Sequence, residues 1–159
     1  MSQEGYDVAQ ICENGHVANS FTQHSPEFNQ TFCQTCGAAT MTKCPGCQAP
    51  IRGGYWGGDF VRECELPKFC INCGKRFPWT SLKIRAATDL AKELDSITDQ
   101  DRSMLEESIG ELTKDTPSTQ VAAVKFKKVM AKAGTSAASM FRDILTDVLS
   151  ETAKKILWP

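Results

Sequence analysis

The chain has little net charge and no long apolar run. Its 159 residues carry a formal net charge of -1, and no stretch approaches the roughly eighteen consecutive apolar residues that a membrane-spanning helix needs. The first seven residues lack both the basic region and the apolar region of a secretory signal. These absences exclude a spanning helix and a recognisable secretory signal, and we expect a soluble, cytoplasmic protein.

Motifs that would indicate catalysis are also lacking. The sequence has only two histidines, and they do not form the helical pair of metalloproteases. The zinc deaminase signature requires His-x-Glu, whereas His16 is followed by Val17 and Ala18. There is no phosphate-binding glycine loop with its lysine, and Cys33 and Cys36 lack the strand-helix-strand setting of a redox pair. We therefore expect a protein that is not an enzyme.

What the sequence does have is eight cysteines, seven of which lie with one histidine in four short turns. The pairs are Cys12 and His16, Cys33 and Cys36, Cys44 and Cys47, and Cys70 and Cys73. Zinc prefers four sulfur or nitrogen ligands in a tetrahedron, and each such turn supplies two of them. Glycines in or beside these turns, which can adopt a positive φ angle, are Gly15, Gly37, Gly46 and Gly74. Eight ligands predict two zinc ions.

The four turns can be combined into two sites in three ways. Sequential pairing joins the first turn with the second and the third with the fourth, which gives tandem zinc ribbons. Interleaved pairing of first with third and second with fourth gives a cross-braced fold. Sequential pairing is favoured because each of its sites encloses a gap long enough for a ribbon hairpin. The four thiolates of the third and fourth turns could also hold iron.

The segment between Cys47 and Cys70 contains Arg52, Tyr55 and Trp56 among two Gly-Gly pairs. One interpretation is a flexible finger whose aromatic tip inserts into a partner or stacks on bases. The other is an ordinary ribbon hairpin whose rings pack on their own small core. Arg52, Tyr55 and Trp56 are therefore candidate partner-binding residues, and both interpretations stay open.

Nucleic-acid binding is the alternative function for this half of the chain. The basic side chains that could gather around the aromatic residues are Lys43, Arg52, Arg62, Lys68, Lys75 and Arg76. However, residues 1–88 carry eight basic and seven acidic groups, and a surface that binds phosphates is usually clearly basic. The balance favours a protein partner over nucleic acid.

The composition changes after Trp79, where cysteine and most of the glycine end and helix-forming residues take over. We predict a double zinc-ribbon domain at residues 1–79 and a helical domain at residues 80–159. A domain of about seventy residues is too small to rely on an apolar core alone. We therefore expect the metal ions to stabilise the first domain, which should be largely unfolded without them.

Capping signals divide the second domain into helices. Thr80 or Ser81 can begin the first, and Thr98 with Asp101 resembles a capping box before the second. Thr116-Pro117 begins a third, which Gly134 ends. Residues 89–115 carry nine acidic and three basic groups, and residues 116–132 carry four basic groups and no acidic one. This contrast suggests that the acidic second helix lies against the basic third.

The last segment predicts the longest helix, beginning at Thr135 or Ser136. Its apolar stripe consists of Phe141, Ile144, Leu145, Val148, Leu149, Ile156 and Leu157. Such a stripe is typical of a bundle face, and it also offers a surface for self-association or for a protein partner. The opposite face carries three acidic groups, which disfavours binding to a membrane surface.

Cys64 and His24 lie outside the four turns. Cys64 is best interpreted as a partly buried bystander rather than a ligand or a reactive thiol. His24 could replace His16, but the spacing from Cys12 to His16 is the ordinary one for a zinc-binding turn. We therefore leave His24 in a loop.

Several segments together resemble a known family. They are Ile11-Cys-Glu-Asn-Gly-His16-Val, Cys33-x-x-Cys-Gly37, Thr42-Lys-Cys-Pro-Gly-Cys-Gln-Ala-Pro-Ile-Arg-Gly53, Cys70-x-Asn-Cys-Gly74 and Ser150-Glu-Thr-Ala-Lys-Lys-Ile-Leu-Trp-Pro159. They are similar to a bacterial zinc-ribbon family, domain of unknown function 2321, over nearly the whole chain. The resemblance implies a bacterial or phage origin and the same eight metal ligands. It implies no activity, because the family has no established one.

The sequence thus predicts a small, metal-stabilised β region of tandem zinc ribbons followed by an all-α C-terminal region of three or four helices. The function that fits it best is a non-enzymatic zinc-binding protein, acting as a protein–protein interaction or regulatory module. Its partner would be another protein or a second copy bound through the C-terminal helices.

Overall fold

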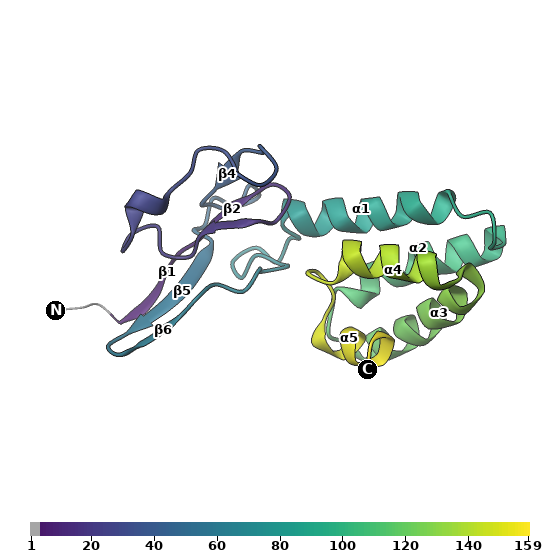
Figure 1. Cartoon of the computed structure of the whole chain (residues 1–159). Coiled ribbons are helices and arrows are strands. Elements are labelled where there is room, and N and C mark those ends of the chain that lie inside the picture. Colours follow the sequence, from purple (N-terminus) through teal and green to yellow (C-terminus); the bar gives the residue numbers. More distant parts are fainter. Residues whose placement is uncertain (1–3) are drawn as a thin grey trace. The chain divides into compact units, whose positions relative to one another are not determined.

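The computed structural model describes residues 4–159, which divide into two compact units, one ending at Thr80 and the other beginning at Ser81. A small β region is followed by several α-helices, which confirms the predicted fold class (Figure 1). Within the described residues, no helix is long and apolar enough to cross a membrane.

The first unit contains two small antiparallel sheets. Strands β1 (Gly5–Val8), β5 (Arg52–Gly57) and β6 (Phe60–Arg62) form one sheet in the order β1-β5-β6. Strands β2 (Gln10–Cys12), β3 (Val17–Asn19) and β4 (Thr40–Met41) form the other in the order β3-β2-β4, and a short 3-10 helix, η1 (Pro26–Phe28), lies between β3 and β4 in sequence. Strands of two to six residues are too short to be stable by pairing alone.

The apolar core of this unit is also small. Its buried side chains are Ala9, Ile11, Cys44, Ile51, Cys70, Phe77 and Trp79. The rings of Phe77 and Trp79 stack with centroids 4.6 Å apart, and Trp79 Nε1 donates to the Pro67 carbonyl at 2.7 Å. Two of the seven core residues are candidate metal ligands, so the core and the metal centres are parts of one structure.

The three Cys-x-x-Cys turns share one backbone conformation. The N–H of the first cysteine donates across the turn at 2.8 Å in each, to Ala38, Ala49 and Lys75 respectively. The residue after the second cysteine has a positive φ, which is 74° at Gly37, 64° at Gln48 and 73° at Gly74. In the third turn the left-handed residue is therefore Gln48 and not Gly46, the glycine that the sequence indicated there. A left-handed non-glycine residue costs about 1 kcal/mol.

The second unit contains five α-helices in the described part of the chain. They are α1 (Pro78–Lys92), α2 (Asp99–Leu112), α3 (Pro117–Ala133), α4 (Thr135–Leu145) and α5 (Glu151–Leu157). The capping box at Thr98 and Asp101 is confirmed, as is the end of the third helix at Gly134. The prediction that Thr80 or Ser81 caps the first helix is wrong. That helix begins two residues earlier, at Pro78, because proline is favoured in the first turn.

The prediction of one long final helix is also wrong. The chain leaves α4 after Leu145 and begins α5 at Glu151. Ser150 separates them, because its Oγ accepts from the N–H of Ala153 at 3.1 Å while its own N–H donates to the Leu112 carbonyl at 2.9 Å. The break lets one sequence stripe line a single core, in which Phe141, Leu145 and Leu149 are fully buried. That part of the stripe is therefore not available for self-association.

The acidic and basic helices are neighbours, as their charges suggested. Helices α2 and α3 pack against each other, and Phe126 of α3 meets Phe141 of α4 edge to face at 5.6 Å. In the described chain, one ion pair joins α2 to α3, between Asp101 Oδ1 and Lys132 Nζ at 2.9 Å. Most of their charged groups therefore face solvent, and the helices are held together mainly by apolar packing.

The left-handed residue in the third turn predicts the effect of a substitution. We expect Gln48→Gly to keep the free energy of unfolding of the metal-loaded protein within about 0.5 kcal/mol of wild type, because relief of the left-handed strain offsets the freedom that glycine adds to the unfolded chain. Chemical denaturation measures this change. The matched control is Gln34→Gly in the second turn, where Gln34 does not have a positive φ. This change should lower the stability, because it only adds freedom to the unfolded chain, and equal effects of the two substitutions would contradict the account.

Candidate metal centres

The first ligand cluster joins the first two turns. The ligand atoms of Cys12, His16, Cys33 and Cys36 all lie within 4.8 Å of one another. Cys12 ends β2, and the N–H of Gly15 donates back to its carbonyl at 2.9 Å, which turns the chain so that His16 faces Cys12. The bridge between Phe32 and Ala39 closes the turn that carries the other two ligands. Strand pairing and turn geometry thus preform this site.

The distances in the first cluster fit a zinc ion. Zinc–sulfur bonds of about 2.3 Å and zinc–nitrogen bonds of about 2.0 Å in a tetrahedron place two sulfurs about 3.8 Å apart and a sulfur and a nitrogen about 3.5 Å apart. The Sγ atoms of Cys12 and Cys36 are 3.7 Å apart. His16 Nδ1 is 3.5 Å from Cys12 Sγ and 3.6 Å from Cys33 Sγ. These separations are also far longer than a disulfide bond.

The second cluster has the same geometry with four sulfurs. The Sγ atoms of Cys44, Cys47, Cys70 and Cys73 lie within 4.8 Å of one another. Cys44 and Cys73 are 3.8 Å apart, and Cys47 and Cys70 are 3.7 Å apart. Both clusters are therefore compatible with a metal ion. The two groups of ligands are those of the sequential pairing and not of the interleaved one.

Two asparagine side chains donate hydrogen bonds to the ligand sulfurs. Asn14 Nδ2 donates to Cys36 Sγ at 3.3 Å, and Asn72 Nδ2 donates to Cys47 Sγ at 3.4 Å. These donors, helped by the backbone N–H groups of Ala38 and Ala49, lower the pKa of both Cys36 and Cys47 to about 6. A hydrogen bond to sulfur favours the thiolate, which is the form that binds metal. Sequence analysis did not identify these two asparagines, although each lies within a ligand turn, Asn14 between Cys12 and His16 and Asn72 between Cys70 and Cys73.

Other thiols in the clusters are shifted in the opposite direction. Burial raises the pKa of Cys12. For Cys73, the N–H of Lys75 lowers the pKa, but burial and the thiols around it raise it to about 11. Several sulfurs packed together cannot all ionise without a compensating charge. A bound dication supplies that charge and ionises the whole set, so the arrangement fits a bound divalent metal ion better than a cluster of free thiols.

Cys64 and His24 are not part of either cluster. Cys64 Sγ donates to the Arg52 carbonyl at 3.4 Å, and burial, with the neighbouring charge of Glu65, raises the pKa of its thiol to about 11. Such a thiol is protonated and unreactive at neutral pH. His24 instead contacts Asp7, with Nδ1 2.6 Å from Oδ2.

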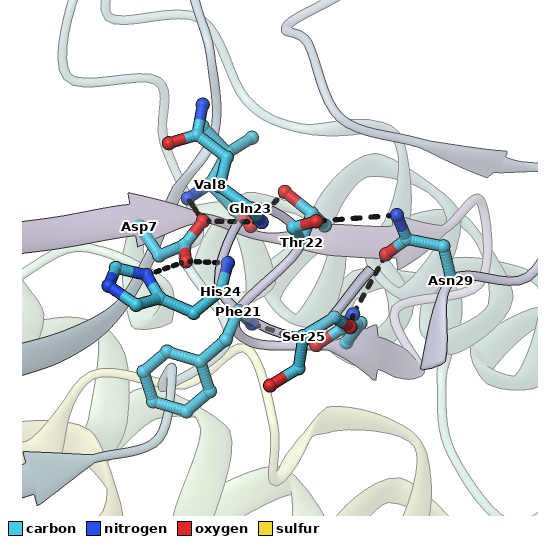
Figure 2. Close-up of polar contacts among 9 residues, drawn as sticks. Asp7, Val8, Phe21, Thr22, Gln23, His24, Ser25 and Asn29 are labelled. Carbon is cyan, nitrogen blue, oxygen red and sulfur yellow. Dashed lines mark hydrogen bonds and ion pairs between the residues drawn. The ribbon is translucent and has the colours of Figure 1, made fainter. Parts of the chain in front are cut away.

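Asp7 organises the loop that follows β3 (Figure 2). Its buried carboxylate accepts from the backbone N–H groups of Val8, Gln23 and His24, at 2.6 to 3.0 Å, as well as from the His24 ring. Burial opposes ionisation, but the His24 ring and the three N–H groups outweigh it and hold the pKa of Asp7 below its usual value. Together with Asn19, whose side chain forms hydrogen bonds with Phe21, Ser25 and Asn29, Asp7 orders a loop that has little regular secondary structure. This role could not be predicted from the sequence, because its loop partners, Gln23 and His24, are sixteen and seventeen residues away.

The three candidate partner-binding residues lie on both sides of β5. Trp56 stacks on the His24 ring at 5.0 Å and meets Phe21 edge to face at 6.3 Å. Tyr55 and Arg52 instead approach Tyr6 of β1. Tyr55 and Trp56 are neighbours in the strand and point to opposite faces. A bulge between Tyr55 and Arg52 brings Arg52 to the Tyr55 side, over the Tyr6 ring, so Trp56 does not share a surface with the other two.

The Gly-Gly pair before Tyr55 does not form a flexible hinge. Gly53 and Gly54 are buried in β5, the central strand of its sheet. A Cβ at Gly53 would lie 2.4 Å from the Ser20 carbonyl, and one at Gly54 would lie 2.3 Å from the Phe21 ring. These two glycines therefore allow close packing of the backbone and do not form the hinge that a flexible finger would need at this end of the segment.

The asparagine donors lead to a prediction about metal affinity. We expect Asn72→Ala to weaken zinc binding roughly tenfold, because outer donors of this kind tune a metal site by such factors. Without the donor, the pKa of Cys47 rises and protons compete more strongly for its thiolate, so zinc should be released at a higher pH during acid titration. A colorimetric chelator reports the release. Ile71→Ala, a change at the adjacent exposed residue, should leave the release pH unaltered, and an equal shift in both variants would refute the role of Asn72.

The Asp7 network leads to a second prediction. We expect Asp7→Asn to lower the free energy of unfolding by about 2 kcal/mol at neutral pH, because the substitution weakens several hydrogen bonds to a buried charge. Urea denaturation followed by tryptophan fluorescence measures it, since Trp56 stacks on His24. Glu13→Gln, at an exposed carboxylate, is the matched control and should change the stability little. A variant as stable as wild type would show that the network contributes nothing.

Comparison with known proteins supports the family that the sequence resembles. No curated protein and no solved structure matches the chain. The model of a family described as an uncharacterized protein conserved in bacteria, DUF2321, matches residues 5–157. Because this match covers almost the whole sequence, the chain belongs to the DUF2321 family.

Proposed function

We propose that the chain is a non-enzymatic zinc protein of the bacterial cytoplasm that binds a protein partner through its β1-β5-β6 sheet. The observation that carries this proposal is a group of aromatic and arginine side chains, exposed except for the half-buried Tyr55, on one face of that sheet. We name this group the tyrosine–arginine face. Its members are Tyr6, Arg52, Tyr55, Phe60 and Arg62.

Zinc is the metal that the ligand sets favour. One set is three sulfurs and one imidazole nitrogen, and the other is four sulfurs. Tetrahedral sites of this composition suit zinc, and the mixed set suits it better than iron. In both clusters the chain can fill all four coordination positions, which leaves none for a reactive water. This supports a structural role for the metal and is the reason that we propose no catalysis.

The tyrosine–arginine face is ordered by its own contacts. Tyr6, Tyr55 and Arg62 are partners across the three strands, and directly opposite residues point to the same side of a sheet. The rings of Tyr6 and Tyr55 meet at 5.3 Å, and the Arg52 guanidinium lies 4.5 Å over the Tyr6 ring. Side chains held in this way lose little freedom when a partner binds.

The same side chains remain accessible. Tyr6 is 50% exposed and Phe60 is 58% exposed. A hollow of about 260 Å³ lies among Tyr6, Arg52, Tyr55 and Arg62, and it extends to Ile71, which is 70% exposed. Tyrosine and arginine around a hollow are the composition of binding hot spots, and this supports a docking role for the face.

Charge favours a protein over nucleic acid as the partner. Glu63 and Glu65 line the same hollow as Arg52 and Arg62, so the local charge is balanced. A phosphate backbone would be repelled by the two carboxylates, whereas a protein surface can pair with charges of both signs. Lys43, another of the basic residues considered for nucleic acid, lines a different hollow.

A site-specific photo-cross-linker tests the proposal. We expect benzoylphenylalanine at Phe60, in the zinc-loaded chain expressed in its own bacterium, to give a discrete protein adduct under ultraviolet light. The adduct should resist nuclease and should be lost when Arg52 and Tyr55 are replaced by alanine, because these residues support the face. Phe28 is the control position, because it is 63% exposed and lies outside the face.

The other results of this experiment are equally informative. A nuclease-sensitive adduct would make the face a nucleic-acid platform, since the stacked tyrosines and Arg52 also suit single-stranded bases. The absence of any adduct at Phe60, or equal adducts at Phe28 and Phe60, would contradict a docking role for this face.

A further inference from the structure

Helix α3 presents a face to solvent that is both apolar and basic. Val121 is 57% exposed and Val124 is 48% exposed. Lys125 and Lys128 are also exposed, and their spacing of three and four residues from the valines places all four on one side of the helix. In residues 4–159, neither lysine forms an ion pair with a carboxylate. The face therefore carries positive charge next to exposed apolar surface.

Helix α2 presents a face of opposite charge. Glu106 and Glu107 are exposed, and so is Ser103, one turn before them. Neither glutamate is paired with a cation in the described chain. Gly110, one turn after them, is partly exposed. The face is thus acidic, and its flanking side chains are small.

The acidic and basic groups stand at the same height along the two helices. The short connection between α2 and α3 makes them an antiparallel hairpin, and the contact of Asp101 with Lys132 at 2.9 Å sets their register. Glu106 lies five residues after Asp101 on α2, and Lys127 lies five residues before Lys132 on α3. Both are therefore roughly 7.5 Å from the Asp101–Lys132 contact, measured along the helix axes. The glutamate pair therefore lies level with Lys125 and Lys128, although both pairs point to solvent rather than toward each other.

We propose that this hairpin surface is self-complementary and that two copies of the chain associate through it. We place the two-fold axis parallel to the helices of the hairpin. The rotation then brings α2 of each copy antiparallel against α3 of the other, and every residue keeps its position along the helix axis. Glu106 and Glu107 of each copy then meet Lys125 and Lys128 of the other. Val124 faces the segment around Gly110, where the lack of a Cβ leaves room for it. Each contact occurs twice, as a symmetric interface requires.

A second copy fits this surface better than an unrelated partner. The surface carries two unpaired acidic and two unpaired basic groups. A second copy of the same surface can pair with all four of these charges, and few other protein surfaces can do so. Two helices of 14 and 17 residues give an interface at the small end of the specific range, so we expect weak, salt-sensitive association. The inference goes beyond the proposed function and does not depend on it, because the docking face lies in the first unit.

Charge reversal with complementation tests the inference. We expect sedimentation velocity of the zinc-loaded full chain to show a monomer–dimer equilibrium at micromolar concentrations and low salt, weakened roughly tenfold at high salt. The variant K125E/K128E should raise the dimer dissociation constant at least about tenfold, and so should E106K/E107K, because each places like charges across the interface. The control R85E/K155E reverses two exposed basic residues outside both the hairpin and the ligand turns and should still dimerise.

Mixing the two charge-reversed variants is the decisive step. Each alone should remain monomeric, whereas their mixture should form a heterodimer, because an all-acidic hairpin then faces an all-basic one. A wild-type chain that stays monomeric at low salt throughout the concentration series would overturn the proposal. So would variants that dimerise as well as wild type, or a mixture of monomeric variants that fails to associate.

Discussion

Tetrahedral coordination is the constraint on which the first half of this protein depends. Eight ligand atoms from four turns have to meet at two points, and the strands between the turns are only two to six residues long. Strands of that length do not pair stably on their own, and the apolar core around Trp79 is too small to fix them. In our proposal the energy of metal binding is folding energy, and the sulfur separations of 3.7 to 3.8 Å match those of a tetrahedral zinc site.

The small core of the first unit also affects which side chains lie on its surface. In the proposed zinc-bound form, the metal ions and the buried Asp7 carboxylate fix the backbone, so the aromatic side chains are not all needed in the core. Tyr6 and Phe60 stay exposed on one face of the β1-β5-β6 sheet, while Trp56 closes the other face against His24. In the helical unit the long apolar stripe packs inside the bundle, and the exposed surface is mainly polar, with a few apolar side chains such as Leu82, Val121, Val124 and Met140. Each unit thus has its own reason for the surface that it presents.

Much of this architecture could be predicted from the sequence. The ligand turns and the capping box at Thr98 are local patterns, in which a few residues determine the conformation, and the family resemblance was specific. Features that depend on distant partners could not be predicted. Ser150 breaks the last helix because its N–H reaches Leu112, Asp7 binds a loop sixteen residues away, and the glycines of β5 are explained only by the backbone and ring that approach them. The spacing of apolar residues in the last segment predicts that they are buried, but it does not predict where the helix breaks so that they can all reach the core.

The central claim is that two closed zinc sites hold the first unit together. X-ray absorption at the zinc edge, combined with metal analysis of the purified chain, tests it most directly. The account predicts two zinc ions per chain, with an average environment of seven sulfurs and one nitrogen shared between them and bond lengths of about 2.3 and 2.0 Å. Fewer than two ions, an oxygen ligand in the average shell, or disulfide bonds in place of zinc thiolates would contradict it.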